Sequence, residues 1–145
     1  MEIKNSDFVR TVRKKFEGNA FSHLMGVRLD SIGHGEVQAS LDLKPELLQQ
    51  NGIAHGGVLM SLCDIVAGFA AFTVAGKGEH VVTASIQVNC LRPATGKLLA
   101  IGRVDKAGRN IFFCSSEVFS VSADGTRTLV SNSSSTMAVA RGLRS

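Results

Sequence analysis

The chain has 145 residues, of which 44% are hydrophobic and 19% are charged, and its mean hydropathy is +0.16. This length and composition predict one folded domain over 1–145, and they exclude a disordered polar chain and a charge-rich coiled coil. The formal net charge of +4 is mild, and Trp and Tyr are absent. The sequence has no clustered basic stripe with aromatic residues, so we expect no nucleic-acid partner.

The first predicted element is an amphipathic helix over residues 7–17, within an N-terminal segment 1–19. Asn5 or Ser6 is expected to cap this helix, and Gly18 is expected to end it. The apolar residues that recur at helical spacing are Phe8, Val9, Val12 and Phe16. One face of the helix is therefore expected to pack against the rest of the domain.

Six later segments have the pattern of strands, either by alternation of apolar and polar residues or as short apolar runs. They are 27–32, 37–43, 82–90, 97–106, 111–122 and 128–140. Turn signals separate them, and Asp124-Gly125 is a strong hairpin signal. Short turns predict that successive strands pair in antiparallel fashion. Residues 141–145 are expected to form a tail.

The segment from Gly56 to Ala75 is apolar on every side. A helix of about 19 residues spans roughly 28 Å, which raises the question of a membrane span. Asp64 near its centre and the lack of a second apolar segment favour the buried centre of a soluble domain instead. One long helix beside an antiparallel sheet is an α+β fold, and we expect no membrane partner.

The cysteines and histidines do not predict a metal site. The three cysteines lie in apolar runs without a CxxC pair, and the histidines lack the spacing of metal ligands. We therefore expect no metal and buried, reduced thiols at Cys63, Cys90 and Cys114. The N-terminal residues include no apolar stretch of the secretory type, so a cytoplasmic location is expected.

The residues around the start of the long helix carry the functional signal. Gly56 and Gly57 lie where a loop enters the helix, so a ligand can approach the backbone closely. The first N–H groups of a helix have no partner within it, and with the helix dipole they suit an anion or a developing oxyanion. Asn51 and His55 flank this position and could hydrogen-bond a carbonyl oxygen or orient the loop.

Asp64 is the second element of the predicted site. A carboxylate within an apolar run is either a structural partner of another group or a reactive carboxylate. Gly57 and Asp64 share a face of the helix, but they lie about 10.5 Å apart along its axis. If both act on one carbon atom, they come from two chains at a two-fold dimer interface.

At these residues the chain resembles the hotdog-fold acyl-CoA thioesterases of the PaaI-like branch. The matching pattern is Asn51, then His55-Gly56-Gly57, then Asp64. Further matches are Thr83, Arg92-Pro93-Ala94 and Gly108-Arg109. The resemblance covers roughly residues 20–140. It implies a long central helix wrapped by an antiparallel sheet, a dimer that can pair into a tetramer, and hydrolysis of acyl-CoA to free acid and CoA.

The resemblance also implies roles for individual residues. The carbonyl oxygen would bind the N–H of Gly57, with help from Asn51 or His55. Asp64 of the partner subunit would activate water as a general base or attack as a nucleophile. The remaining substrate-binding candidates are Gly56, Thr83, Arg92 and Arg109. No cofactor is expected apart from the CoA of the substrate itself.

Alternatives to this interpretation stay open. By simple alternation Thr83 shares a face with Ser85, so it reaches the site only if a bulge or the dimer edge turns it inward. A hotdog domain can also bind acyl-CoA as a sensor, although a sensor does not need the Asp64 carboxylate. Cys63 is disfavoured as a nucleophile because it points about 100° away from Asp64 on the helix.

The subsites for the acyl group and the CoA nucleotide are less defined. Four basic residues on or near strand ends could hold phosphates, and they are Arg92, Arg103, Lys106 and Arg109. Four phenylalanines could line an acyl pocket, and they are Phe69, Phe72, Phe112 and Phe113. Core packing and ordinary surface charge explain the same residues, so the acyl group stays open.

Overall fold

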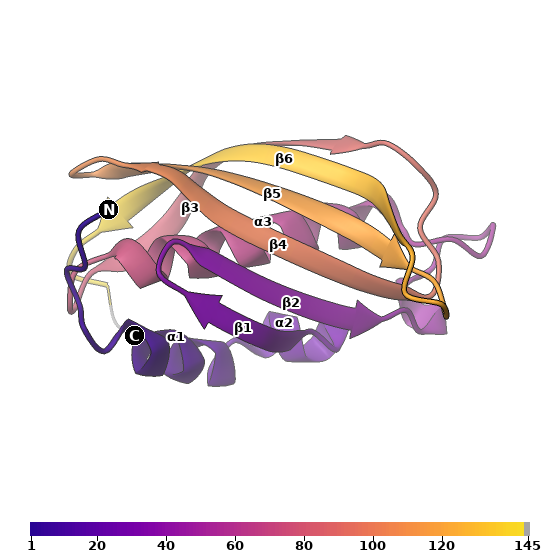
Figure 1. Cartoon of the computed structure of the whole chain (residues 1–145), viewed down its shortest axis with the longest axis horizontal. Helices are drawn as coiled ribbons and strands as arrows, with labels where there is room; N and C mark the ends of the chain where they lie inside the picture. Colours follow the sequence, from indigo (N-terminus) through magenta and orange to yellow (C-terminus); the bar gives the residue numbers. More distant parts are fainter. Residues whose placement is uncertain (144–145) are drawn as a thin grey trace.

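The structure, a computed structural model, describes residues 1–143, and the last two residues of the predicted tail 141–145 lie outside the described part. The six strands are β1 (Arg28–Gly33), β2 (Glu36–Asp42), β3 (His80–Cys90), β4 (Lys97–Ala107), β5 (Ile111–Val121) and β6 (Arg127–Ala140). The helices are α1 (Phe8–Glu17), α2 (Ala20–Met25), the short 3-10 helix η1 (Pro45–Leu47) and α3 (Gly56–Val74). Figure 1 shows the sheet lying across α3.

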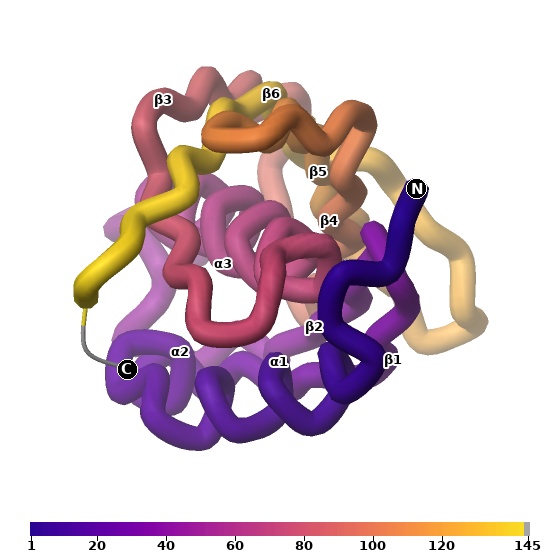
Figure 2. The backbone as a smooth tube through the Cα atoms, turned by 90° about the vertical axis from the view of Figure 1, so that its left-hand side faces the viewer, coloured from indigo at the N-terminus to yellow at the C-terminus, as the bar shows by residue number. Residues whose placement is uncertain are grey.

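The sheet curves around α3, and α1 and α2 lie on the side of α3 away from β5 and β6 (Figure 2). This arrangement confirms the predicted α+β hotdog fold. The close contact between β4 and α3 requires glycine at residue 102, because a Cβ atom there would lie 2.3 Å from the backbone carbonyl of Val66 in α3. By length and composition α3 could cross a membrane, but 61% of its apolar window is buried inside the fold, as in the core helix of a folded domain.

The strand order corrects one expectation from the sequence. The order in the sheet is β1-β2-β4-β5-β6-β3, with every pair antiparallel. β3 and β4 follow one another along the chain but are not neighbours, because β3 pairs with β6 and β4 pairs with β2 and β5. Short turns therefore predicted the hairpins correctly but not the place of β3, which lies at an edge of the sheet.

The N-terminal segment contains two helices where the sequence predicted one. α1 ends at Gly18 as expected, whereas its N-cap position is Asp7; the Asn5 side chain accepts a hydrogen bond from the Asp7 N–H at 3.0 Å. α2 was missed. Asn19 caps it by accepting from the Ser22 N–H, and Gly26 ends it in the left-handed conformation, with φ of 84°. An asparagine cap and a glycine stop were the signals that could have found this short helix.

Candidate active site

The start of α3 is held in place by the loop before it. The Ala54 N–H donates to the Ala94 carbonyl at 2.9 Å, and the His55 N–H donates to the Leu47 carbonyl at 2.9 Å. These bonds tie the loop to η1 and to the segment after β3. The backbone at His55 is extended, and the helix begins at the next residue, Gly56. The position that the sequence singled out is therefore a fixed helix N-terminus.

His55 is the N-cap of α3, and this changes which N–H groups are available. Its Nδ1 atom accepts a hydrogen bond from the Gly57 N–H at 2.9 Å. A Cβ atom at residue 57 would lie 3.1 Å from that nitrogen, so glycine leaves room for the imidazole ring. Among residues 1–143 no acceptor is found for the Gly56 N–H. Gly56, not Gly57, thus presents a free N–H at the helix start.

Asp64 lies in the middle of α3 and meets the edge strand. The Thr83 hydroxyl donates a 2.6 Å hydrogen bond to Oδ1 of Asp64. The pairing of β3 with β6 shifts register between Thr83 and Ser85, so Thr83 leaves the outward face on which simple alternation places it. The sequence indicated that Thr83 could reach the site only through a bulge or at the dimer edge, and the structure shows the bulge together with the contact to Asp64.

Asp64 and Thr83 open into a cavity of about 260 Å³, here called the Asp64 cavity. Its other lining residues are mostly apolar and come from the α2 region, α3 and the strands: Asn19, Phe21, Ser61, Ile65, Gly68, Phe69, Phe72, Val81 and Met137. Two of the four predicted phenylalanines are thus at the cavity. Phe112 is fully buried in the core, and Phe113 is exposed on the other face of β5.

A second cavity, of about 510 Å³, lies at the start of the same helix and is here called the His55 cavity. His55, Gly57, Val58 and Ser61 line its α3 side. Its remaining lining comes from α2 and the segment around η1: Phe21, Leu24, Met25, Lys44, Glu46, Leu47 and Leu48. Phe21 and Ser61 line both cavities, so the two spaces adjoin along the groove between α2 and α3.

The other predicted residues are not brought to these cavities within one chain. Asn51 is exposed in the loop, and its backbone N–H donates to the Gln49 side chain at 3.1 Å. Arg92 donates to the Leu129 carbonyl at 2.9 Å, near the start of β6. Arg109 lies in the turn before β5, next to Asn110, whose carbonyl accepts from Val139 near the end of β6.

Leu129 and Val139 are ten residues apart on β6, a span of about 33 Å at roughly 3.3 Å per residue. Arg92 and Arg109 of one chain therefore lie at opposite ends of the sheet and cannot both contact the same CoA nucleotide.

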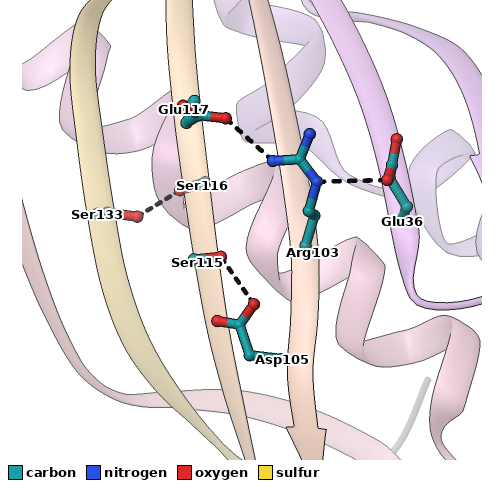
Figure 3. Close-up of polar contacts among 7 residues, drawn as sticks. All are labelled: Glu36, Arg103, Asp105, Ser115, Ser116, Glu117 and Ser133. Carbon is teal, nitrogen blue, oxygen red and sulfur yellow. Dashed lines mark hydrogen bonds and ion pairs between the residues drawn. The ribbon is translucent and has the colours of Figure 1, made fainter. Parts of the chain in front are cut away.

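Arg103 forms ion pairs with carboxylates on its own sheet, as Figure 3 shows. It lies within β4 between two carboxylates, with Glu117 at 3.0 Å and Glu36 at 3.4 Å. The hydrogen bond to Glu117 raises the pKa of the Arg103 guanidinium. In the same view Ser115 donates to Asp105. Because its charge is already compensated, Arg103 is a poor candidate for binding a phosphate.

Cys63, the alternative nucleophile, is buried and lines neither cavity. Its sulfur lies 3.5 Å from the Ser131 hydroxyl, and burial raises the pKa of the thiol. The backbone carbonyl of Cys63 accepts a hydrogen bond from the Ser116 hydroxyl, which also contacts the Ser133 hydroxyl on the buried face of the sheet (Figure 3). A buried thiol with a raised pKa is a weak nucleophile.

Cys114 is buried as well. The expectation of a buried thiol was wrong for Cys90, which is exposed at the end of the edge strand β3.

The comparisons with known proteins bear on the same residues. The model of the thioesterase superfamily matches residues 51–125, just over half of the chain, and this match includes His55, Asp64 and Thr83. The chain belongs to the thioesterase superfamily. A Haemophilus influenzae protein whose name marks it as a candidate esterase is 32% identical over 94 residues, which are 64% of this chain and 67% of that protein.

Solved structures agree with this membership. A thioesterase family protein from Silicibacter pomeroyi has a TM-score of 0.90 and 25% identity, over 93% of this chain and 99% of that one. The Escherichia coli PaaI protein from the phenylacetic acid degradation operon has a TM-score of 0.83 over 97% of this chain and 98% of its own, and its 19% identity makes it evidence for the fold alone. Membership of this superfamily indicates, in general terms, that the protein hydrolyses thioesters.

Proposed function

We propose that this thioesterase superfamily member hydrolyses acyl-CoA thioesters to free acid and CoA, with Asp64 as the reacting carboxylate. The observation that carries the proposal is Asp64 itself, a half-buried carboxylate at a mostly apolar cavity. Its Oδ1 atom is oriented by Thr83, and within residues 1–143 no hydrogen-bond donor is found for the second carboxylate oxygen, which can therefore act. A carboxylate that lines a mostly apolar cavity is an arrangement for chemistry rather than for packing.

The thioester carbonyl oxygen is proposed to bind the Gly56 N–H. The sequence pointed to Gly57, but His55 already accepts that N–H. The N–H of Gly56 lies at the positive end of the 19-residue helix α3, where developing negative charge is stabilised. His55 then acts as a positioning residue that holds the helix start, while Gly57 leaves space for its ring. Asn51 is exposed in the loop before them, and its proposed role is to contact the substrate from there.

Two chains are proposed to build each site through the edge strand β3. Thr83 near the start of β3 contacts Asp64, whereas Cys90 at its end lies near Gly56, since a Cβ at residue 56 would be 4.0 Å from the Cys90 sulfur. Antiparallel pairing of β3 with a second copy brings the Thr83 end of one chain to the Cys90 end of the other. Asp64 of one protomer then faces Gly56 of its partner, at two equivalent sites.

The edge itself supports this pairing. Within residues 1–143, β3 has a strand neighbour on one side only. Its 11 residues are mostly exposed, and Val82 and Ile86 are 43% and 36% exposed. Long exposed edges with apolar residues are otherwise protected in folded proteins. The same pairing places Arg92 of one chain and Arg109 of the partner subunit at the same end, where both can meet a CoA phosphate.

The reaction follows one of two balanced routes. As a general base, Asp64 takes a proton from water, whose oxygen adds to the thioester carbon; the C–S bond then breaks and CoA leaves as the thiol after taking up a proton. As a nucleophile, Asp64 first forms an acyl anhydride and expels CoA, and water then hydrolyses the anhydride. Single turnover in H₂¹⁸O separates the routes, since only the second can place ¹⁸O in the Asp64 carboxyl group.

The decisive experiment is CoA release from short, aromatic and long acyl-CoA esters by the wild type and Asp64→Asn. We expect turnover by the wild type and a loss of about 10²–10⁴-fold in the variant, because a general base contributes that much. Asn keeps the size of the side chain and can still accept from Thr83, so circular dichroism and gel filtration are expected not to change. No turnover of any ester, but saturable binding, contradicts hydrolysis and favours the sensor function. The same gel filtration tests the dimer and the tetramer expected from the resemblance.

A further inference from the structure

The two cavities that adjoin along α3, the Asp64 cavity and the His55 cavity, share two lining residues, Phe21 of α2 and Ser61 of α3. Of these two shared residues Phe21 has the larger side chain, so its ring is the group that could limit passage from one cavity to the other. The Phe21 side chain is 53% exposed, so core packing does not fix the position of its ring.

The Asp64 cavity is small for a complete acyl site. Its volume of about 260 Å³ lies below the range of about 300–1,000 Å³ that is usual for small-molecule sites. The cavity at His55 adds about 510 Å³. Among the residues of its lining are Leu24, Met25, Leu47 and Val58, so this added space is mainly apolar. An extended hydrocarbon chain is the ligand chemistry that fits such a space.

We propose that Phe21 determines the acyl-chain length that this enzyme accepts, by closing the passage from the Asp64 cavity into the apolar His55 cavity. The inference rests on the proposed thioesterase function. With the ring in place, the acyl group of the substrate is confined to the Asp64 cavity, which suits short or compact acyl groups. When the ring is removed, a longer chain continues past Ser61 into the His55 cavity and buries its distal methylenes there.

Phe21→Ala tests this inference with butanoyl-, hexanoyl-, decanoyl- and dodecanoyl-CoA. The ratio of kcat/KM for dodecanoyl-CoA to that for butanoyl-CoA is expected to rise at least about tenfold, because the burial of about two further methylenes suffices for that factor. Phe21→Trp places a larger side chain at this position and is expected to lower the same ratio of kcat/KM values. Since Phe21 is half exposed, neither variant removes a core residue, and both are expected to fold.

The matched control is Phe113→Ala. Phe113 is 47% exposed, lies on β5 and lines neither cavity, so the same chemical change is made away from the passage. The inference is overturned if the ratio in Phe21→Ala stays within twofold of the wild type, or if Phe113→Ala raises it equally. The inference is also overturned if Phe21→Ala changes the affinity for all four esters and for free CoA by the same factor. In that case the His55 cavity holds the CoA part of the substrate.

The proposed function and this inference fail in different ways. Wild type that cleaves no ester contradicts the hydrolysis, whatever Phe21 does. In that case the dissociation constants of the same four CoA esters, measured by calorimetry for wild type and Phe21→Ala, give the chain-length ratio directly. A tenfold shift of that ratio supports the role of Phe21 as a length-determining residue, and an unchanged ratio contradicts it.

Discussion

The Thr83 hydroxyl donates a 2.6 Å hydrogen bond to the Asp64 carboxylate, and this contact joins the edge strand β3 to the middle of the central helix. It exists because β3 contains a bulge just after Thr83. The bond fixes one carboxylate oxygen of a residue that lines the Asp64 cavity. Strand geometry therefore controls the orientation of a group on a helix.

Thr83→Val removes this hydrogen bond while keeping the shape of the side chain. Hydrogen bonds to charged groups contribute about 1.5–3 kcal/mol, so kcat is expected to fall about tenfold to a hundredfold. Thr83→Ser is expected to restore most of the rate. Steady-state kinetics checks both variants. Ser85→Ala is the control, because Ser85 lies in the same strand but contacts Thr136 on the outer face; a similar loss there would contradict a specific role for Thr83.

Gly56→Pro deletes the N–H that we propose to bind the carbonyl oxygen. Proline is well tolerated at the first residue of a helix, and the extended backbone of His55, with ψ of 138°, suits a residue before proline. Loss of one oxyanion donor costs about 10²–10³ in rate. We expect that loss in kcat with an unchanged circular dichroism spectrum. Full activity in the folded variant would place the oxyanion elsewhere.

Mixing Gly56→Pro with Asp64→Asn protomers tests the two-chain site. In a mixed dimer one of the two sites combines the intact Gly56 of one chain with the intact Asp64 of the other. Such dimers are expected to regain up to about half of wild-type activity per dimer, whereas each variant alone stays inactive. Tagged subunits purified as heterodimers allow the measurement. Inactive, verified heterodimers would mean that each chain carries a complete site.

His55→Ala removes the cap of α3. Loss of an N-cap typically costs about 1 kcal/mol, so Tm is expected to fall by roughly 3–5 °C. His55→Asn supplies another good cap and is expected to recover most of this loss in a thermal melt. If His55 served only to contact substrate, its removal would change KM and leave Tm unaltered.

Stability at high pH is expected to depend on Cys114. Burial raises the pKa of this thiol to about 12 from an ordinary value near 9. The unfolded chain therefore loses the thiol proton first as pH rises above 9, and the free energy of unfolding falls between pH 9 and pH 12.

Cys114→Ala removes this contribution. Between pH 8 and pH 10.5 the variant is expected to lose about 1–2 kcal/mol less stability than the wild type in urea titrations. Cys90→Ala is the control, because Cys90 is exposed. Parallel pH profiles of the wild type and Cys114→Ala would contradict the assignment.

The long helix and the pattern of strands were predictable from local sequence. A continuous apolar run bounded by His55 and Gly76, and the alternation in 37–43, are properties of neighbouring residues. The same holds for the placement of Gly56, Gly57 and Asp64 on one helix, since helix geometry is regular. The cap by His55 and the helix α2 were also local, but their short signals were overlooked.

The sequence by itself determined the α+β class and the position of the long apolar helix, because both depend on the periodicity of adjacent residues, whereas the hotdog fold was implied by the resemblance. Only the tertiary structure decided that β3 lies at the edge, that a bulge turns Thr83 toward Asp64, and that Phe21 stands between two cavities. Those facts depend on contacts between segments distant along the chain, whose pairing is set by how the whole sheet wraps around α3.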